Sequence, residues 1–333
     1  MQRETSTIAD RLGDSRSKAY SLAGEIHVCT VIAPKPLHEL DILKREAISA
    51  ASDTADAYIQ GWTRYVIGWE EIHRGRMNDA RDAARELMQV GRLLNDPRST
   101  GQGLALLTWI ALTSDSYAEA LEYSEQSLAV AVTPFDRGAA VNGKGCALVL
   151  LRQTEEGAKL LEEDRRRCIT DSDLYALAST DAMLAISKIF QGKIGEGIGL
   201  IEEAILKREQ EDYRRVADWT RLNLAEVYLQ IIAGNEKLPL PTLLKNLPIL
   251  LKVMVTASSR IRALMTRVME YPLLHPAGHH AGHAQMILGL MYKAKKKRAL
   301  AVQHLTEARW ILSQFGQTPM LARVETALAE LGQ

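Results

Sequence analysis

Small residues recur in this chain at steps close to forty, each inside a stretch whose apolar residues have helical spacing. The copies are marked by Gly68, Thr108, Gly145, Ala185, Ala225 and Gly289. In each copy a turn follows about seven residues later and a second small residue about twelve later, the pattern of two helices that approach closely. One such hairpin cannot bury its apolar face alone, so its neighbours must stack. The repeat therefore predicts an all-α, right-handed superhelical solenoid of antiparallel helix pairs, with a groove.

The clearest copy is the last one, "LGLMYKAKKKRALAVQHLTEA" at 288–308. Similar frames begin near residues 67, 107 and 184, and weaker ones centre on Gly145 and Ala225. Small residues let two helix backbones meet, while larger apolar ones at three- and four-residue steps fill the space between them. The residues that define the repeat are Gly68, Gly75, Ala80, Ala120, Gly192, Gly197, Ala204, Leu288, Gly289, Tyr292, Ala301, Leu305 and Ala308.

The composition favours helices throughout. Hydrophobic residues make up 47% of the 333 residues, but aromatic residues make up only 5%. Alanine and leucine lose little side-chain entropy in a helix, whereas strands prefer β-branched and aromatic residues. Recurring small residues also occur in irregular helical bundles, but the nearly constant spacing favours a solenoid.

The predicted array covers residues 1–333 as a single domain. Pro239 and Pro241 interrupt a helix within an insertion at 233–253, which explains the one long gap between copies. The expected helix pairs lie near 15–52, 55–95, 100–133, 137–168, 172–210, 214–271 and 277–315, followed by a closing helix at 318–331.

The pattern Leu-Gly-x-x-Tyr, then Ala, Leu and Ala, resembles the tetratricopeptide (TPR) signature, although the usual TPR period is shorter. The segment 295–331, with its basic turn, "HLTEA" and "FGQTP", resembles the C-terminal TPR region of bacterial class III adenylate/guanylate cyclases that carry an ATPase module. The stretch 213–231 is similar to that group as well. No cyclase or nucleotide-binding module occurs in these residues. The resemblance therefore implies a regulatory or interaction region and not an enzyme.

The run "HPAGHHAGH" at 275–283 raises the possibility of a metal site. His279 and His283 stand four residues apart, a spacing that zinc sites use on helices. A zinc site needs a third protein ligand, however, and the nearest carboxylates, Glu270 and Glu307, are distant in sequence. Pro276 suits the first turn of a helix. The run is therefore interpreted as the entry to a helix, and we expect no metal and no cofactor.

Two other segments could be interpreted as ligand sites, but a structural role explains each of them. The glycine-rich stretch "GKIGEGIG" at 192–199 lacks the P-loop pattern and follows a helix, so its glycines are assigned to a turn and a helix contact. The basic cluster "KAKKKR" at 293–298 lies between two helices, where a solvated turn or a surface for an acidic partner is expected.

The charge balance and the absence of targeting features argue against a nucleic-acid-binding protein and a membrane protein. The 41 basic residues balance the 41 acidic ones, which argues against nucleic-acid binding. The polar N-terminus and the absence of a long apolar run predict a cytoplasmic protein without membrane insertion. Cys29, Cys146 and Cys168 are widely separated, as expected of reduced, buried thiols.

The sequence therefore predicts a binding module that captures a peptide or a partner protein, with cyclase or ATPase modules as candidate partners. By resemblance to TPR proteins, the first helix of each pair lines the groove, which in the last pair assigns His283, Met286, Leu290 and Lys293 to partner binding. A free-standing adaptor is the main alternative function. A metal-dependent enzyme that uses the histidine run is the remaining one.

Overall fold

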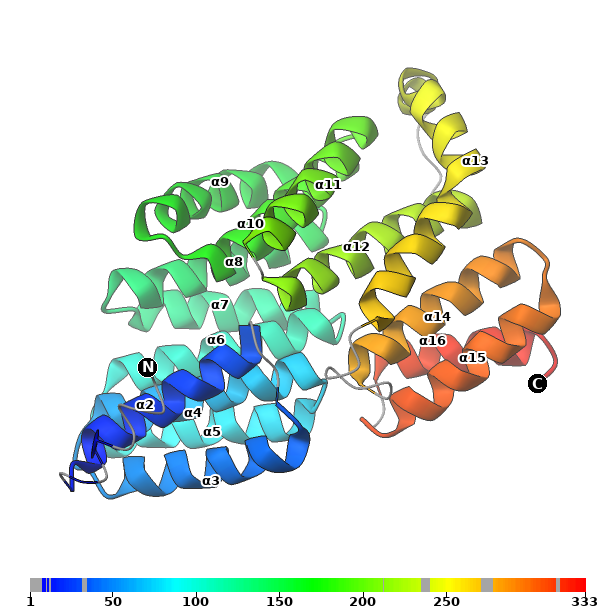
Figure 1. Ribbon diagram of the computed structural model, residues 1–333. Helices are drawn as coiled ribbons and strands as arrows, with labels where there is room; N and C mark the ends of the chain where they lie inside the picture. The colour runs from blue at the N-terminus through cyan, green and yellow to red at the C-terminus, as the bar shows by residue number, and fades with distance from the viewer. Residues whose placement is uncertain are drawn as a thin grey trace. The chain divides into compact units, whose positions relative to one another are not determined.

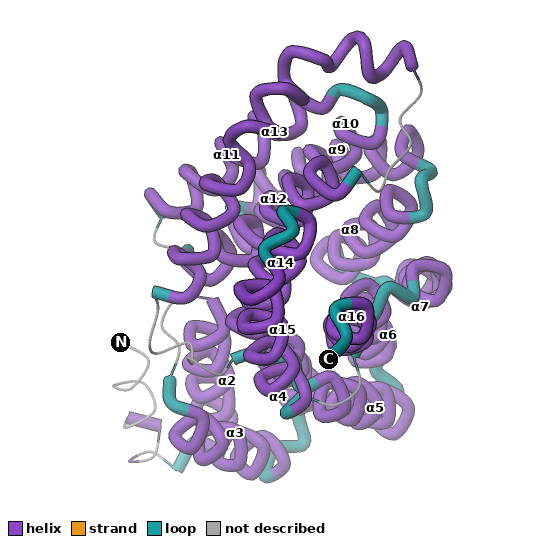
Figure 2. The backbone as a smooth tube through the Cα atoms, turned by 90° about the vertical axis from the view of Figure 1, so that its right-hand side faces the viewer, coloured by secondary structure: helices purple, strands orange, loops and turns teal. Residues whose placement is uncertain are grey.

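The computed structural model describes residues 8–9, 11, 13–31, 35–211, 213–234, 240–270, 278–315 and 318–333. Within these residues the chain forms helices and turns and no strand (Figures 1 and 2). This confirms the predicted all-α solenoid of helix pairs. The contacts divide the chain into two compact units, residues 1–176 and 177–333. Whether they act as the single array expected from the sequence stays a prediction.

The first unit contains four complete helix pairs. Its helices are α2 (Ser15–Val31), α3 (Leu37–Ser52), α4 (Ala57–Arg74), α5 (Met77–Leu93), α6 (Pro97–Thr113), α7 (Tyr117–Val130), α8 (Pro134–Leu150) and α9 (Thr154–Asp171). The first helices of successive pairs contact one another, α2 with α4, α4 with α6 and α6 with α8, while α3, α5 and α7 each pack between two first helices. We call α2, α4, α6 and α8 the first-helix layer.

The second unit contains the remaining pairs and a closing helix. Its helices are α10 (Leu174–Phe190, which begins in the first unit), α11 (Ile194–Gln210), α12 (Arg214–Ala233), α13 (Leu240–Met269), α14 (His279–Ala294), α15 (Arg298–Ser313) and α16 (Pro319–Glu330). Its largest apolar core joins side chains of α10 to α14, and a second core joins α14, α15 and α16. The insertion predicted at 233–253 contributes the N-terminal half of the long helix α13.

Local sequence explains where several helices begin. Asp56 and Asp96 accept hydrogen bonds from the first backbone N–H groups of α4 and α6. At α8, Thr133 and Asp136 form a reciprocal capping box, with Pro134 in the first turn. Such caps satisfy donors that a helix start otherwise leaves unpaired.

A left-handed residue ends the first helix of five pairs, at Gly75, Asp115, Arg152, Gly192 and Lys296, each with φ between +57° and +79°. Only two of the five are glycine, the residue that adopts this conformation without strain. The turn therefore has the same left-handed backbone conformation in all five pairs, although the residue at the turn differs.

Small residues also lie at the helix contacts. A Cβ atom added to Gly68 would lie 2.4 Å from Leu106 Cδ1, and one added to Gly289 would lie 2.6 Å from Leu305 Cγ. Leu288, Ala204 and the fully buried Ala80, Ala120, Ala301, Leu305 and Ala308 belong to the apolar core, and Tyr292 packs partly buried against it.

Candidate binding surface

Four aromatic rings follow one face of α4. Trp62, Tyr65, Trp69 and His73 are spaced by three, four and four residues, which places them side by side on a helix. Tyr65 is buried, whereas Trp62, Trp69 and His73 are each partly exposed. The centroids of the Tyr65 and Trp69 rings lie 6.2 Å apart in an edge-to-face arrangement. The helix therefore presents a continuous aromatic edge.

Neighbouring helices of the first unit add further rings. Trp109 of α6 lies 5.5 Å from Trp69 between ring centroids. Phe135, in the first turn of α8, lies 6.3 Å from Trp62 and is exposed. His27 of α2 lies 6.4 Å from Trp62. Each helix of the first-helix layer thus contributes at least one ring.

Tyr175, the second residue of α10, completes this group. Its ring centroid lies 5.7 Å from those of both Trp69 and His73, and 6.4 Å from that of His27. The Tyr175 hydroxyl and His73 Nε2 share a hydrogen bond across 102 residues of sequence. We refer to the eight residues as the aromatic cluster: His27, Trp62, Tyr65, Trp69, His73, Trp109, Phe135 and Tyr175.

Burial disfavours the charged forms of two groups in the aromatic cluster. Burial lowers the pKa of His27, and the charge of Asp173 opposes that shift without cancelling it. Burial also raises the pKa of Tyr65 above its usual value. Asp173 is itself paired with Arg167 at 3.4 Å. Partly exposed rings with a few polar groups are typical of surfaces that bind apolar or aromatic side chains of a partner.

The closing helix packs against part of the face of α14 that was assigned to partner binding. Met286 is 0% exposed and packs with Leu321 and Val324 of α16, so its assignment to an accessible groove is corrected to a core position. Leu290 is partly buried against the same core. Lys293 pairs with Glu330 of α16. This chain's own last helix thus buries Met286, while His283, Leu290 and Lys293 stay partly exposed.

His283 belongs to a polar group formed by three helices. Its Nε2 lies 3.1 Å from Glu226 Oε1 on α12, and Arg323 of α16 donates to both oxygens of the same carboxylate. Burial would raise the pKa of Glu226, but the hydrogen bond and charge of His283, together with Arg323, outweigh it and lower the pKa to about 2. The arrangement holds α12, α14 and α16 together.

His279 lies at the start of α14, where its ring meets that of Phe315 edge to face with 5.7 Å between centroids. Burial, with a smaller contribution from the charge of His283, lowers the pKa of His279 to about 4. In the part of the chain that the structure describes, no three His, Cys, Asp or Glu side chains are grouped to hold a metal ion. His275 and Pro276 lie outside the described residues.

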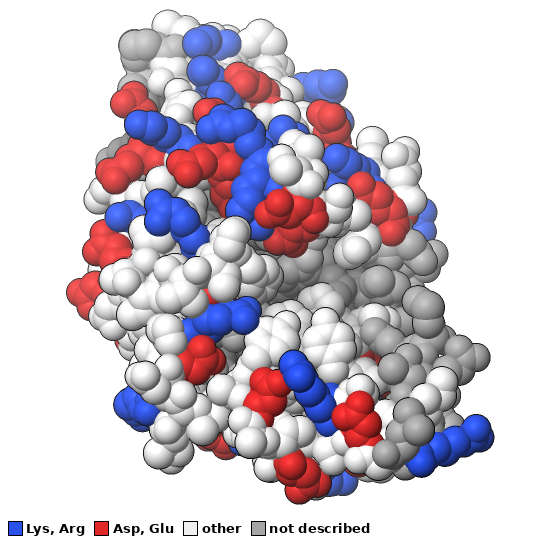
Figure 3. All heavy atoms as spheres, turned by 90° about the vertical axis from the view of Figure 1, so that its left-hand side faces the viewer, with Lys and Arg blue, Asp and Glu red and all other residues white. Residues whose placement is uncertain are grey.

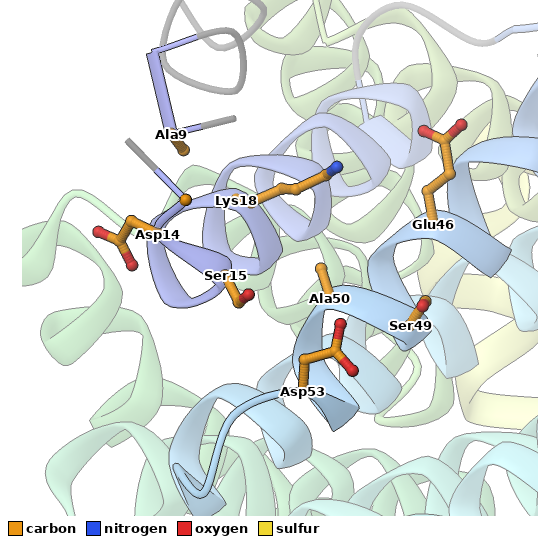
Figure 4. A pocket seen from close by; sticks show the side chains of 9 residues that line it. Ala9, Asp14, Ser15, Lys18, Glu46, Ser49, Ala50 and Asp53 are labelled. Atoms are coloured by element: carbon orange, nitrogen blue, oxygen red, sulfur yellow. The ribbon is translucent and has the colours of Figure 1, made fainter. Parts of the chain in front are cut away.

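A pocket of 250 Å³ lies between α2 and α3 (Figure 4). Its polar side chains include three carboxylates and the ammonium group of Lys18. Asp14 is engaged in capping α2, since it accepts hydrogen bonds from the backbone of Arg16 and Ser17. The lining is otherwise made of small residues, which offer a ligand few contacts. The pocket is lined by Ala9, Gly13, Asp14, Ser15, Lys18, Glu46, Ser49, Ala50 and Asp53.

The face drawn in Figure 3 has no dominant charge. On this face, acidic and basic side chains are intermixed. No helix among the described residues is long and apolar enough to cross a membrane.

The sequence pattern did not predict the aromatic cluster, although part of the cluster has a recognisable helical spacing. The segment "WTRYVIGWEEIHR" at 62–74 places four rings on one helical face, and three of the five tryptophans of the chain lie in the cluster. His27, Phe135 and Tyr175 carry no such local pattern.

No protein-family model and no curated protein matches this chain. Among solved structures, one similar chain is "Rap Protein Complexed with Competence and Sporulation Factor", with a TM-score of 0.58 and 13% identity over 96% of this chain and 86% of that one. A second is a Podosopora anserina putative kinesin light chain with nearly identical TPR-like repeats, with a TM-score of 0.41 and 16% identity over 67% of this chain and 99% of that one. With the helix pairs described above, the first likeness shows a TPR-like helical repeat fold.

Proposed function

We propose that this chain is a protein-interaction module that binds an extended or helical peptide segment of a partner and performs no catalysis itself. The observation that carries the proposal is the aromatic cluster, where partly exposed Trp62, Trp69 and Trp109 lie together on the first-helix layer. Tryptophan and tyrosine dominate binding energy at interfaces because they bury a large area at little cost in side-chain entropy.

The likeness to the Rap structure supports this choice, because that helical repeat protein was solved in a complex with Competence and Sporulation Factor. The polar edge of the cluster, at His73 and Tyr175, adds hydrogen-bonding groups that can select among apolar partners. We infer that the ligand inserts an apolar or aromatic side chain beside Trp69.

The experiment selects peptides from a random displayed library against the whole chain and measures their affinity by fluorescence anisotropy. We expect Trp69→Ala and Trp109→Ala each to weaken binding about tenfold or more, and Trp69→Phe to retain part of it. The matched control is Trp310→Ala, because Trp310 is an exposed tryptophan on α15 in the second unit. Selected peptides that bind the Trp69→Ala and wild-type chains equally well would refute the assignment.

A more specific proposal for the partner comes from the amino-acid sequence of residues 295–331. The resemblance of residues 295–331 to the TPR region of class III cyclases leads us to propose a cyclase or ATPase module as the regulated partner. The test is to add the purified chain to a cyclase encoded next to it and measure cyclic-nucleotide formation. A change in rate that is lost with Trp69→Ala supports this partner, and an unchanged rate with a chain that binds its selected peptides argues against it.

A further inference from the structure

The helix α13 has an unusual charge for this chain. Although acidic and basic residues balance overall, residues 240–269 contain no Asp or Glu. They contain five cations, Lys245, Lys252, Arg260, Arg262 and Arg267. Arg260 pairs with Glu202 and Arg267 with Glu270. Among the described residues, neither Lys245 nor Lys252 forms an ion pair, and both are exposed.

The N-terminal half of α13 also exposes a stripe of large apolar side chains. These are separated by three or four residues, except for the last adjacent pair, and therefore share one side of the helix. Val255 is 84% exposed, which is unusual for a residue of its type. We call this set the α13 stripe: Leu244, Leu247, Leu251, Met254 and Val255.

One angular position of the stripe is covered further along α13. Leu247 and Met265 are eighteen residues apart, about five helical turns, and so have the same angular position. Leu247 is 47% exposed, whereas Met265 is 0% exposed and belongs to the core that includes α14. Arg262 and Met269, which repeat the positions of two other stripe residues, are exposed, so only one edge of this side is packed in the C-terminal half.

Helix lengths explain why the stripe stays uncovered. The 30 residues of α13 extend about 45 Å, while the 16 residues of α14 extend only about 24 Å. Figures 1 and 2 show the N-terminal half of α13 reaching beyond α12 and α14. The stripe spans residues 244–255, so a helix of about three turns would match its length.

The stripe faces away from the core of the second unit. At about 100° per residue, it is centred roughly 120° from the buried side around Leu250, Val253 and Ala257, and Val255 lies close to the outermost direction. Lys252, which is also exposed, borders the stripe. The stripe is therefore open to a partner helix from the flank and from outside.

The lysines define the charge of the occupant. Lys245 and Lys252 border the stripe one position after Leu244 and Leu251. A second copy would bring the same cations and no carboxylates, and like charges at an interface disfavour association. A helix with acidic residues beside its apolar face would complement both features.

We propose that the α13 stripe is a docking surface for an acidic amphipathic helix of a partner protein. The surface is separate from the aromatic cluster and uses none of its residues, so each proposal can fail without the other. Leu251 and Met254 would act as apolar anchors, and Lys245 and Lys252 would select the acidic partner.

The test uses two labelled helical peptides of the same length, with leucines at matching three- and four-residue steps. One has glutamates beside the leucines, and the other has lysines at the same positions. We expect the glutamate peptide to bind the whole chain and the lysine peptide to bind about tenfold more weakly or not at all. The double variant Lys245→Glu/Lys252→Glu should reverse this preference, a result that loss of folding cannot produce.

Leu251→Ser/Met254→Ser should weaken the glutamate peptide about tenfold. Leu93→Ser is the matched control, because Leu93 is an exposed leucine on α5 and its replacement should change nothing. Equal affinity for the two peptides, or no binding of the glutamate peptide, overturns the proposal. Stripe-dependent cosedimentation with phosphatidylserine vesicles, or stripe-dependent dimers in analytical ultracentrifugation, in place of peptide binding also overturns it.

Discussion

Arg323 of α16 donates to both carboxylate oxygens of Glu226 on α12, at 3.0 and 3.2 Å. The two residues are 97 positions apart in sequence, and their contact joins the two helices. Two parallel hydrogen bonds of this kind fix geometry as well as energy. Because His283 of α14 contacts the same carboxylate, Glu226 links the closing helix to α14 as well as to α12. The same contact holds α16 near α14, where it buries Met286 of the predicted groove face.

Glu226→Gln should destabilise the chain by roughly 2–3 kcal/mol at pH 7, because the pKa of Glu226 is lowered to about 2 in the folded chain. A depressed carboxyl pKa contributes stability above the unfolded value of about 4.5 and loses it as pH falls toward about 2. Urea unfolding of both chains across this range should therefore show a difference that shrinks in acid. Glu325→Gln is the control, an exposed carboxylate on α16. A difference that stays constant down to pH 2.5 would contradict the ion pair.

His279 should make stability depend on pH in a higher window. Its pKa is about 4 in the folded chain and 6.5 in a model peptide, so the unfolded chain takes up the proton first. Between about pH 6.5 and pH 4 the wild type should lose about 1–3 kcal/mol of stability, and His279→Gln should lose less. Thermal unfolding of both chains across this pH range measures the difference in lost stability. His38→Gln is the control, because His38 is exposed. Identical pH profiles for wild type and His279→Gln would rule out this role.

Local pattern predicted the helices well because apolar periodicity and small residues act within one hairpin. The pair expected at 55–95 contains α4 and α5, and Gly75 lies at the turn between them. The equivalent turns at Asp115 and Arg152 adopt the same backbone conformation without a glycine to reveal it.

Tertiary contacts explain what the pattern could not show. Met286 lies on the same helical side as His283, but only the packing of α16 determines that Met286 is buried. Trp62, Tyr65 and Trp69 have a visible helical spacing. Tyr175 joins them from another helix, 102 residues beyond its partner His73.

The three cysteines should resist alkylation in the folded chain. Burial raises the pKa of Cys29 to about 11 and that of Cys168 to about 12, and it raises the pKa of Cys146 as well. Because the thiolate is the nucleophile, iodoacetamide at pH 8 should modify none of them quickly until urea unfolds the chain. Mass spectrometry counts the modified thiols. Rapid labelling of a single cysteine in the native chain would show that its helix opens locally.

Two glycines of α11 test whether small residues are needed at the helix contacts. Gly197 and Gly199 are both in the interior of this helix, so alanine gains the same helix propensity at either position. A Cβ atom at Gly197 would lie 2.5 Å from the carbonyl oxygen of Ala185 and 2.5 Å from Ile189 Cγ1, both on α10. At Gly199 it would meet nothing within 4 Å.

Gly197→Ala should therefore destabilise the chain by about 1–3 kcal/mol, because α10 and α11 must move apart. Gly199→Ala should stabilise it by about 0.5–1 kcal/mol through the reduced entropy of the unfolded chain. Urea unfolding of the two variants measures both effects, and each variant serves as the control for the other. If both substitutions stabilise the chain equally, the close approach of α10 to α11 at Gly197 is refuted. Opposite signs two residues apart would show that the small residue is selected by the neighbouring helix and not by helix propensity.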